Sequence, residues 1–379
     1  MTGWHITGGD VLRGATLAAG DLALAGEAIA ATPLPGARRL DATGLLVLPG
    51  LVDIHGDAHE RSLQPRPGIN FPPALALRDT VAQLLASGIT TAFLGVTLSW
   101  EPGLRSLAMW RALMAALDGA GALPLDLRIH CRFEADNLYA VDDVLAGIAA
   151  GRIHLLGFND HTPAILEKLG NAKDLAKYAG RAGLTPEEFH ALIERIAARR
   201  GEIPAARARL AAAAAGIPML SHDDATLEDR ALYRALGARL CEFPMAEAVA
   251  ADARAHGEAV VMGAPNVVRG GSHLGWASAA PLVERGLVTI LASDYHWPAL
   301  LEAPFAMARR GKLSLAEAWP LVSANPATAA GLTDRGALHP GMRGDVVVID
   351  PAGPRVLACF VAGEAALLTG DAIARLRQG

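Results

Sequence analysis

The sequence has no excess of positive charge, because 34 Lys and Arg stand against 39 Asp and Glu and give a formal net charge of −5. A nucleic-acid partner is therefore not expected, since binding a phosphate backbone requires a basic surface that releases counterions. Long apolar runs are also absent. The mean hydropathy is +0.28, yet Gly, Pro, Arg or Asp interrupts each alanine-rich stretch well before about 18 residues, so we expect no membrane partner.

The sequence has only three cysteines, and its first residues do not match a secretory leader. Cys131, Cys241 and Cys359 are too far apart in sequence to suggest a disulfide framework or a thiolate zinc site, and we interpret them as small buried apolar residues. The opening MTGWHITGGD lacks the basic and apolar regions of a secretory signal. We therefore expect a cytoplasmic protein.

The 379 residues, 52% of them hydrophobic, suffice for a large core and suit either two domains or one barrel with an appendage. Residues 1–49 and 340–379 share short β-like segments punctuated by Gly and Asp. This shared pattern predicts one small β-sandwich domain formed from both chain termini. Residues 50–339 alternate apolar strand candidates with helical patterns, which indicates parallel βα units.

Eight strands are predicted in this central region, which is the number in a closed (β/α)8 barrel of the α/β class. They are Leu51–His55, Ile89–Leu94, Leu127–Phe133, Ile153–Phe158, Met219–His222, Arg239–Phe243, Ala259–Met262 and Val288–Ala292. A long helical insertion, about 163–216, follows the fourth strand, and Thr185 to Glu188 match a capping box there. The insertion is either a lid over the barrel mouth or a set of helices packed outside it.

Metal-ligating residue types lie at the ends of five predicted strands, where barrel enzymes carry their catalytic groups. The candidate ligands are His55, Asp57, Glu134, His161, His222 and Asp294. Any one of them has an ordinary structural explanation, but five strand ends together favour a metal site. Imidazole and carboxylate ligands without thiolate suit Zn²⁺, or else Mn²⁺ or Fe²⁺, as one or two ions with room for a bound water.

Several segments resemble known families. The segments LLVLPGLVDIHGD (45–57) and SANPATAAGLTDRGALHPGMRGDVVVID (323–350), with Asp294, resemble the amidohydrolase superfamily, whose barrel holds one or two divalent metals. Within it, six further motifs resemble the PhnM family of phosphonate metabolism: HERSLQPRPG (59–68), NDHTP (159–163), SHDDAT (221–226), EFP (242–244), MGAPNVVRGGSH (262–273) and LASDYHWPALL (291–301).

The PhnM resemblance implies hydrolysis of α-D-ribose 1-methylphosphonate 5-triphosphate to the 5-phosphate and pyrophosphate, by attack of metal-bound hydroxide on the α-phosphorus. It implies that Asp294 contacts the metal and accepts a proton from the nucleophilic water. This chain departs from the superfamily pattern at Asp57, which replaces the second His of a His-x-His pair, and at Glu134, which lies on the third strand instead of the fourth. His161 and His222 also fall one strand earlier than the usual imidazole pair.

Donors for a phosphorylated substrate are concentrated after the seventh strand, where barrel enzymes often hold phosphate. The candidate substrate-binding residues are Arg66, beyond the first strand, with Asn266, Arg269, Ser272 and His273 in the glycine-rich segment. His59 and His296 receive no role. The expected partners are a small anionic phosphorylated substrate and, optionally, a second copy of the chain as a homodimer.

Two other functions remain open at this point. Metal-activated water also cleaves C–N bonds, so an amidohydrolase acting on a cyclic amide or deaminating a heterocycle is one alternative. A catalytically inactive barrel that acts as a binding protein is the other, and it predicts degraded ligand positions. The Arg-bearing glycine loop favours the anionic substrate.

Overall fold

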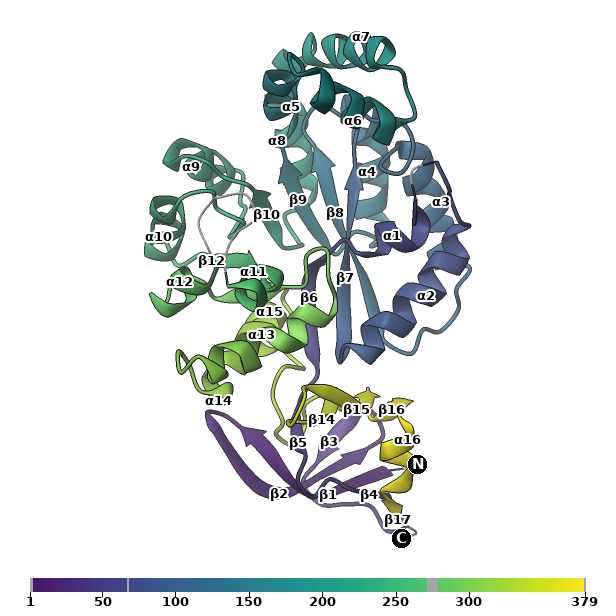
Figure 1. Cartoon of the computed structure of the whole chain (residues 1–379), viewed down its shortest axis with the longest axis vertical. Helices are drawn as coiled ribbons and strands as arrows, with labels where there is room; N and C mark the ends of the chain where they lie inside the picture. The colour runs from purple at the N-terminus through teal and green to yellow at the C-terminus, as the bar shows by residue number, and fades with distance from the viewer. Residues whose placement is uncertain (1–2, 67, 271–278, 378–379) are drawn as a thin grey trace.

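The computed structural model describes residues 3–66, 68–270 and 279–377, and it contains two β-sheets (Figure 1). The larger sheet has eight parallel strands that pair in sequence order. They are β6 (Leu51–Gly56), β7 (Ile89–Leu98), β8 (Asp126–Glu134), β9 (Leu155–Asn159), β10 (Met219–His222), β11 (Leu240–Glu242), β12 (Ala259–Gly263) and β13 (Ile290–Ala292). A parallel bridge between Gly56 and Asp294 brings the first and last strands together. The predicted TIM-like barrel and all eight strands are confirmed.

These strands read as apolar runs because both of their faces are covered. Ile54, Phe93 and Leu220 belong to a cluster that fills the barrel interior, while the outward residues pack against helices. The three cysteines are free and buried, as predicted.

Helices follow the strands and surround the barrel. They are α2 (Pro73–Ala86), α3 (Leu107–Asp118), α4 (Val141–Ala149), α8 (Ile203–Ala213), α9 (Leu227–Ala235), α10 (Glu247–Ala255), α12 (Ala279–Glu284) and α13 (Pro298–Arg309). Shorter elements are α1 (His59–Leu63), η1 (Leu138–Ala140), η2 (Arg200–Glu202), α11 (Ala264–Arg269), α14 (Leu315–Ala318), η3 (Trp319–Val322) and α15 (Ala324–Ala329). Across the described ranges, no helix is both long and apolar enough to cross a bilayer.

The smaller sheet combines the two ends of the chain, as the sequence texture predicts. Its strands are β1 (Gly3–Arg13), β2 (Thr16–Ala25), β3 (Ala28–Ala30), β4 (Arg38–Asp41), β5 (Leu46–Pro49), β14 (Val346–Asp350), β15 (Arg355–Val361), β16 (Glu364–Leu368) and β17 (Leu376–Arg377), with α16 (Gly370–Ala374) beside them. Most pairs are antiparallel, but the first half of β1 pairs in parallel with β4 and the second half with β5. The sheet therefore branches at β1 and encloses its own core cluster, which includes Trp4, Leu24 and Phe360.

The insertion after the fourth barrel strand contains α5 (Thr162–Lys168), α6 (Ala172–Ala182) and α7 (Pro186–Ala197) ahead of α8. The predicted capping box is present. The Thr185 side chain accepts a hydrogen bond from the Glu188 N–H, and the Glu188 side chain accepts one from the Thr185 N–H. Phe189 and Ile193 pack with Trp100 from the loop after β7 in a separate small core. This core places α5, α6 and α7 beyond the C-terminal ends of β8 and β9, at the opposite end of the molecule from the smaller sheet (Figure 1).

Candidate metal centre and active site

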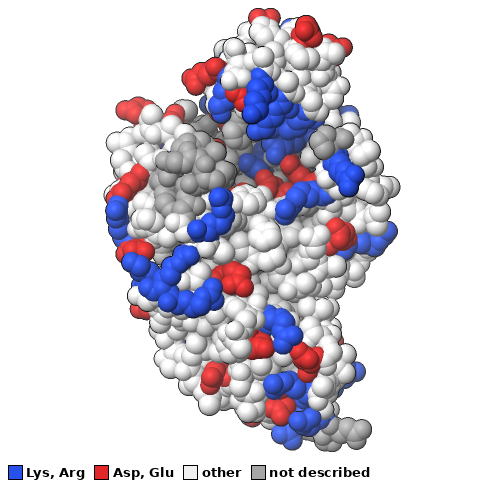
Figure 2. Space-filling view, viewed as in Figure 1, with Lys and Arg blue, Asp and Glu red and all other residues white. Residues whose placement is uncertain are grey.

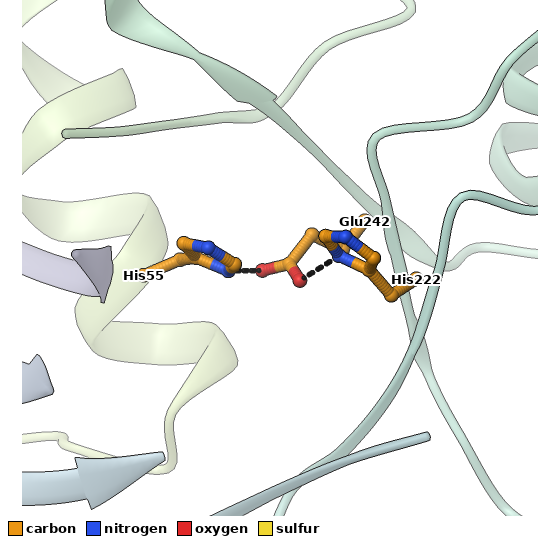
Figure 3. Close-up of side chains that lie close together, drawn as sticks. All are labelled: His55, His222 and Glu242. Atoms are coloured by element: carbon orange, nitrogen blue, oxygen red, sulfur yellow. Dashed lines mark hydrogen bonds and ion pairs between the residues drawn. The ribbon is translucent and has the colours of Figure 1, made fainter. Parts of the chain in front are cut away.

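A buried glutamate joins two histidines across the barrel (Figure 3). His55, near the end of β6, places its Nδ1 2.7 Å from Oε1 of Glu242, the last residue of β11. The other Glu242 oxygen is 2.8 Å from Nδ1 of His222, the last residue of β10. Burial alone would raise the pKa of Glu242, but the two imidazoles lower it well below its ordinary value. Glu242 is therefore an ionised carboxylate in the barrel interior.

A second set of ligands lies where the barrel closes, and we call His55, Asp57 and Asp294 the closing group. Their ligand atoms all lie within 4.8 Å of one another. The Asp57 N–H donates to the Asp294 carbonyl at 2.9 Å, and the Asp294 N–H donates to the His55 carbonyl at 2.9 Å. Gly56 is required between them, because a Cβ there would lie 1.8 Å from Cζ3 of Trp297. Burial raises the pKa of Asp294 to about 6.

A third set, His161, His222 and Asp223, faces the insertion, and we call it the insertion-side group. Its ligand atoms also lie within 4.8 Å of one another. Glu134, the last residue of β8, accepts a hydrogen bond from the His161 N–H at 3.2 Å and contacts Nδ1 of the same residue. The negative charge of Glu134 is the main cause that raises the pKa of His161 to about 9, although burial opposes it. Glu134 thus orients the His161 ring and leaves Nε2 directed towards Asp223, at 3.6 Å.

The structure brings the six predicted ligands together at one end of the barrel. Five of them are divided between the closing group and the insertion-side group, and the sixth, Glu134, contacts His161 and belongs to neither group. Sequence analysis missed Glu242, Asp223 and Arg132. A signal existed for Glu242, because it ends the sixth strand and follows the same strand-end rule as the others.

The predicted substrate-binding residues are more dispersed. Arg66 is exposed in the loop after α1, and Arg269 is exposed at the end of α11, where its Nη1 lies 3.4 Å from the Tyr295 hydroxyl. Asn266, also on α11, has a buried Oδ1 with no hydrogen-bond partner in the described part of the chain. Ser272 and His273 lie outside the described residues.

The two histidines without a predicted role differ in their surroundings. His59 is buried at the start of α1, and its burial lowers its pKa, whereas His296 is exposed beside the closing group.

A cavity of about 590 Å³ lies between the insertion-side group and the insertion helices. Its cationic lining residues within the described ranges are Arg105, Arg132, Lys168, Arg181 and Arg207. Figure 2 shows acidic side chains inside this hollow and Lys and Arg around its rim. Four of the five cations are paired with carboxylates: Arg105 with Glu60, Arg132 with Asp57, Arg181 with Glu101 and Arg207 with Asp160. Among the described lining residues, Lys168 is the cation with no ion-pair partner.

The donor set fits a divalent metal. His55 is 0% exposed, and within the described residues its Nε2 has neither a hydrogen-bond partner nor an ion-pair partner. Buried polar atoms of this kind are costly unless they are paired or coordinate a cation. Imidazole and carboxylate ligands are those that Zn²⁺, Mn²⁺ and Fe²⁺ accept.

Comparison with known proteins gives one close relative in sequence. The chain is 34% identical to alpha-D-ribose 1-methylphosphonate 5-triphosphate diphosphatase of Escherichia coli (strain K12) over 322 residues, which cover 82% of this chain and 84% of that protein. No family model matches the sequence.

Solved structures share the fold. A triazine hydrolase variant superposes with a TM-score of 0.65 at 16% identity, covering 97% of this chain and 95% of that one. An amidohydrolase from an environmental sample of the Sargasso Sea gives a TM-score of 0.61 at 17% identity, covering 97% and 93%. The architecture is that of the amidohydrolase superfamily.

Proposed function

Because the chain belongs to the alpha-D-ribose 1-methylphosphonate 5-triphosphate diphosphatase family, we propose that it hydrolyses this triphosphate to the 5-phosphate and pyrophosphate. The observation that carries the proposal is the cavity itself. It holds Lys168, a cation without an ion-pair partner among the described lining residues, together with the insertion-side ligands, which suits a substrate that is both anionic and hydrolysed at phosphorus.

Cationic groups on two sides of the ligands match a substrate that is anionic at both ends. Lys168 and Arg181 line the cavity on the insertion side. On the other side, Arg61 Nη2 donates to the Tyr295 carbonyl and Arg269 approaches the Tyr295 hydroxyl, directly after Asp294 in sequence. We assign the pyrophosphate leaving group to the insertion side and the methylphosphonate to Arg61 and Arg269, so that the α-phosphorus lies between them.

Asp294 is the group that accepts the proton of the attacking water. A divalent ion, when bound, lowers the pKa of its water to about 7. The ligand atoms of Asp294, His55 and Asp57 lie within 4.8 Å of one another, so the Asp294 carboxylate is within reach of a water held at this group. Arg132 and Lys168 supply positive charge to the phosphoryl oxygens, where negative charge is redistributed as the bond to pyrophosphate breaks.

The metal itself is proposed as Zn²⁺, with Mn²⁺ or Fe²⁺ as the other candidates. His55, Asp57 and Asp294 offer one nitrogen and two carboxylate ligands, which leaves a position for water.

The proposal is tested by phosphorus NMR on the metal-loaded protein incubated with α-D-ribose 1-methylphosphonate 5-triphosphate. We expect free pyrophosphate to appear, to vanish after chelation, and to return when Zn²⁺ or Mn²⁺ is restored. An unchanged spectrum from a protein that verifiably holds its metal would contradict the diphosphatase proposal. Turnover of a cyclic amide by the same sample would then favour C–N hydrolysis.

Lys168 gives a sharper test of the substrate's orientation. Lys168→Ala should raise KM for the triphosphate about tenfold, because one charge-assisted contact to phosphate contributes about 1.5 kcal/mol or more. Steady-state kinetics would measure the effect. Lys173→Ala is the matched control, since this exposed lysine lies on the next helix and does not line the cavity. Equal KM values for the two variants would remove Lys168 from the phosphate site.

A further inference from the structure

A buried arginine lies between the closing group and the insertion-side group. Arg132 is on β8, two residues from Glu134 and two from His130, so all three side chains point into the barrel. Arg132 is 5% exposed. Its Nη1 donates to Oδ2 of Asp57 at 3.0 Å, and its Nη2 is 3.1 Å from Nε2 of His222. One guanidinium therefore contacts a ligand of each group.

The contact with His222 occupies a nitrogen that the insertion-side group would need to bind a metal. His222 has both ring nitrogens engaged, because Nδ1 meets Glu242 at 2.8 Å and Nε2 accepts from Arg132 at 3.1 Å. A guanidinium has only donors and keeps its charge, so it offers no lone pair to a metal and repels a cation placed beside it. The Glu134 contact occupies Nδ1 of His161 and leaves its Nε2 directed towards Asp223. With Nε2 of His222 occupied by Arg132, this group keeps two of its three ligands, His161 and Asp223.

The closing group differs at the second imidazole nitrogen. Nδ1 of His55 is paired with Oε1 of Glu242 at 2.7 Å, but its Nε2 has no hydrogen-bond partner within the described residues. The Arg132 contact uses only Oδ2 of Asp57 and leaves Oδ1 for coordination. Asp294 contributes a carboxylate within 4.8 Å of both.

We infer that Arg132 takes the place of a second metal ion, so that the chain holds one divalent ion, at His55, Asp57 and Asp294. The guanidinium supplies the positive charge that a second ion would bring to the insertion-side group. Because it is part of the chain, its position is fixed and it needs no coordinating side chains. This inference rests on the proposed metal centre but not on the identity of the substrate.

Metal counting tests the inference without any activity measurement. Apo-protein would be saturated with Mn²⁺, desalted and analysed by elemental mass spectrometry. We expect one equivalent per chain for the wild type and two for Arg132→Met, which keeps the length of the side chain but removes its charge and donors. Arg105→Met is the matched control, because Arg105 lines the same cavity but pairs with Glu60. It should retain one equivalent.

Two equivalents in the wild type would overturn the inference, and so would one equivalent in both the wild type and Arg132→Met. Should Arg132→Met fail to fold, electron paramagnetic resonance of the Mn²⁺-loaded wild type decides the question. A spectrum of isolated ions is expected, and a spin-coupled pair would refute the single-ion centre. An enzyme that holds two ions and still releases pyrophosphate would refute the single-ion inference but not the proposed function. The two claims can therefore fail separately.

Discussion

Asp294→Asn is expected to lower kcat by about 10³-fold, the scale of a lost general base. The amide cannot accept the proton of the attacking water, and it is a weaker metal ligand than the carboxylate it replaces. The fold should persist, because the backbone bonds that join Asp294 to His55 and Asp57 do not involve its side chain. Asp294 also has a φ of 57°, in the left-handed region, where Asn is among the residues best tolerated.

Pyrophosphate release measures kcat, and circular dichroism with metal content shows whether the fold and the ion are retained. Asp143→Asn is the control, since Asp143 pairs with Arg111 on the outer face of the barrel helices. Turnover of Asp294→Asn within about tenfold of the wild type would contradict its role as the proton acceptor.

Arg230→Met is expected to lower the free energy of unfolding by about 3–5 kcal/mol, the range for breaking a buried ion pair from one side. Arg230 is 0% exposed on α9. It contacts Asp224 at 3.1 Å and Glu258 at 3.0 Å, and it donates to the Ala238 carbonyl at 2.6 Å. Methionine would leave the buried Asp224 carboxylate with Ser221 as its hydroxyl partner, at 2.6 Å.

Urea unfolding of the metal-saturated protein would measure this loss. Arg199→Met is the matched control, because Arg199 pairs with Glu202 at an exposed site and surface pairs contribute little. Its unfolding midpoint should match that of the wild type. Equal midpoints for Arg230→Met and the wild type would mean that the buried network does not stabilise this side of the barrel.

The strand-end rule located most of the candidate site, for a topological reason. In a parallel barrel the C-terminal ends of all strands meet at one mouth, so His55, His222 and Asp294 are brought together despite their separation in sequence. Glu242 obeys the same rule. The predicted sixth strand, Arg239–Phe243, extends one residue past Glu242, and only the structure shows that the strand ends at this glutamate.

Other features depended on packing that the sequence does not display. Asp223 and Asp224 are adjacent, yet Asp223 has a φ of 58° and joins the insertion-side group, while Asp224 is held by Arg230. Nothing in the order of residues distinguishes the two carboxylates. The position of Lys168 depends in turn on how the insertion helices pack around Phe189, which is a tertiary contact.

The most direct test of the proposed chemistry is hydrolysis of α-D-ribose 1-methylphosphonate 5-triphosphate in ¹⁸O-labelled water, followed by mass analysis of both products. Attack at the α-phosphorus breaks its bond to the bridging oxygen, so the label should appear in the 5-phosphate and the pyrophosphate should be unlabelled. Label in pyrophosphate would place the attack at the β-phosphorus and contradict the assigned mechanism. Absence of both products from the metal-loaded enzyme would contradict the diphosphatase function itself.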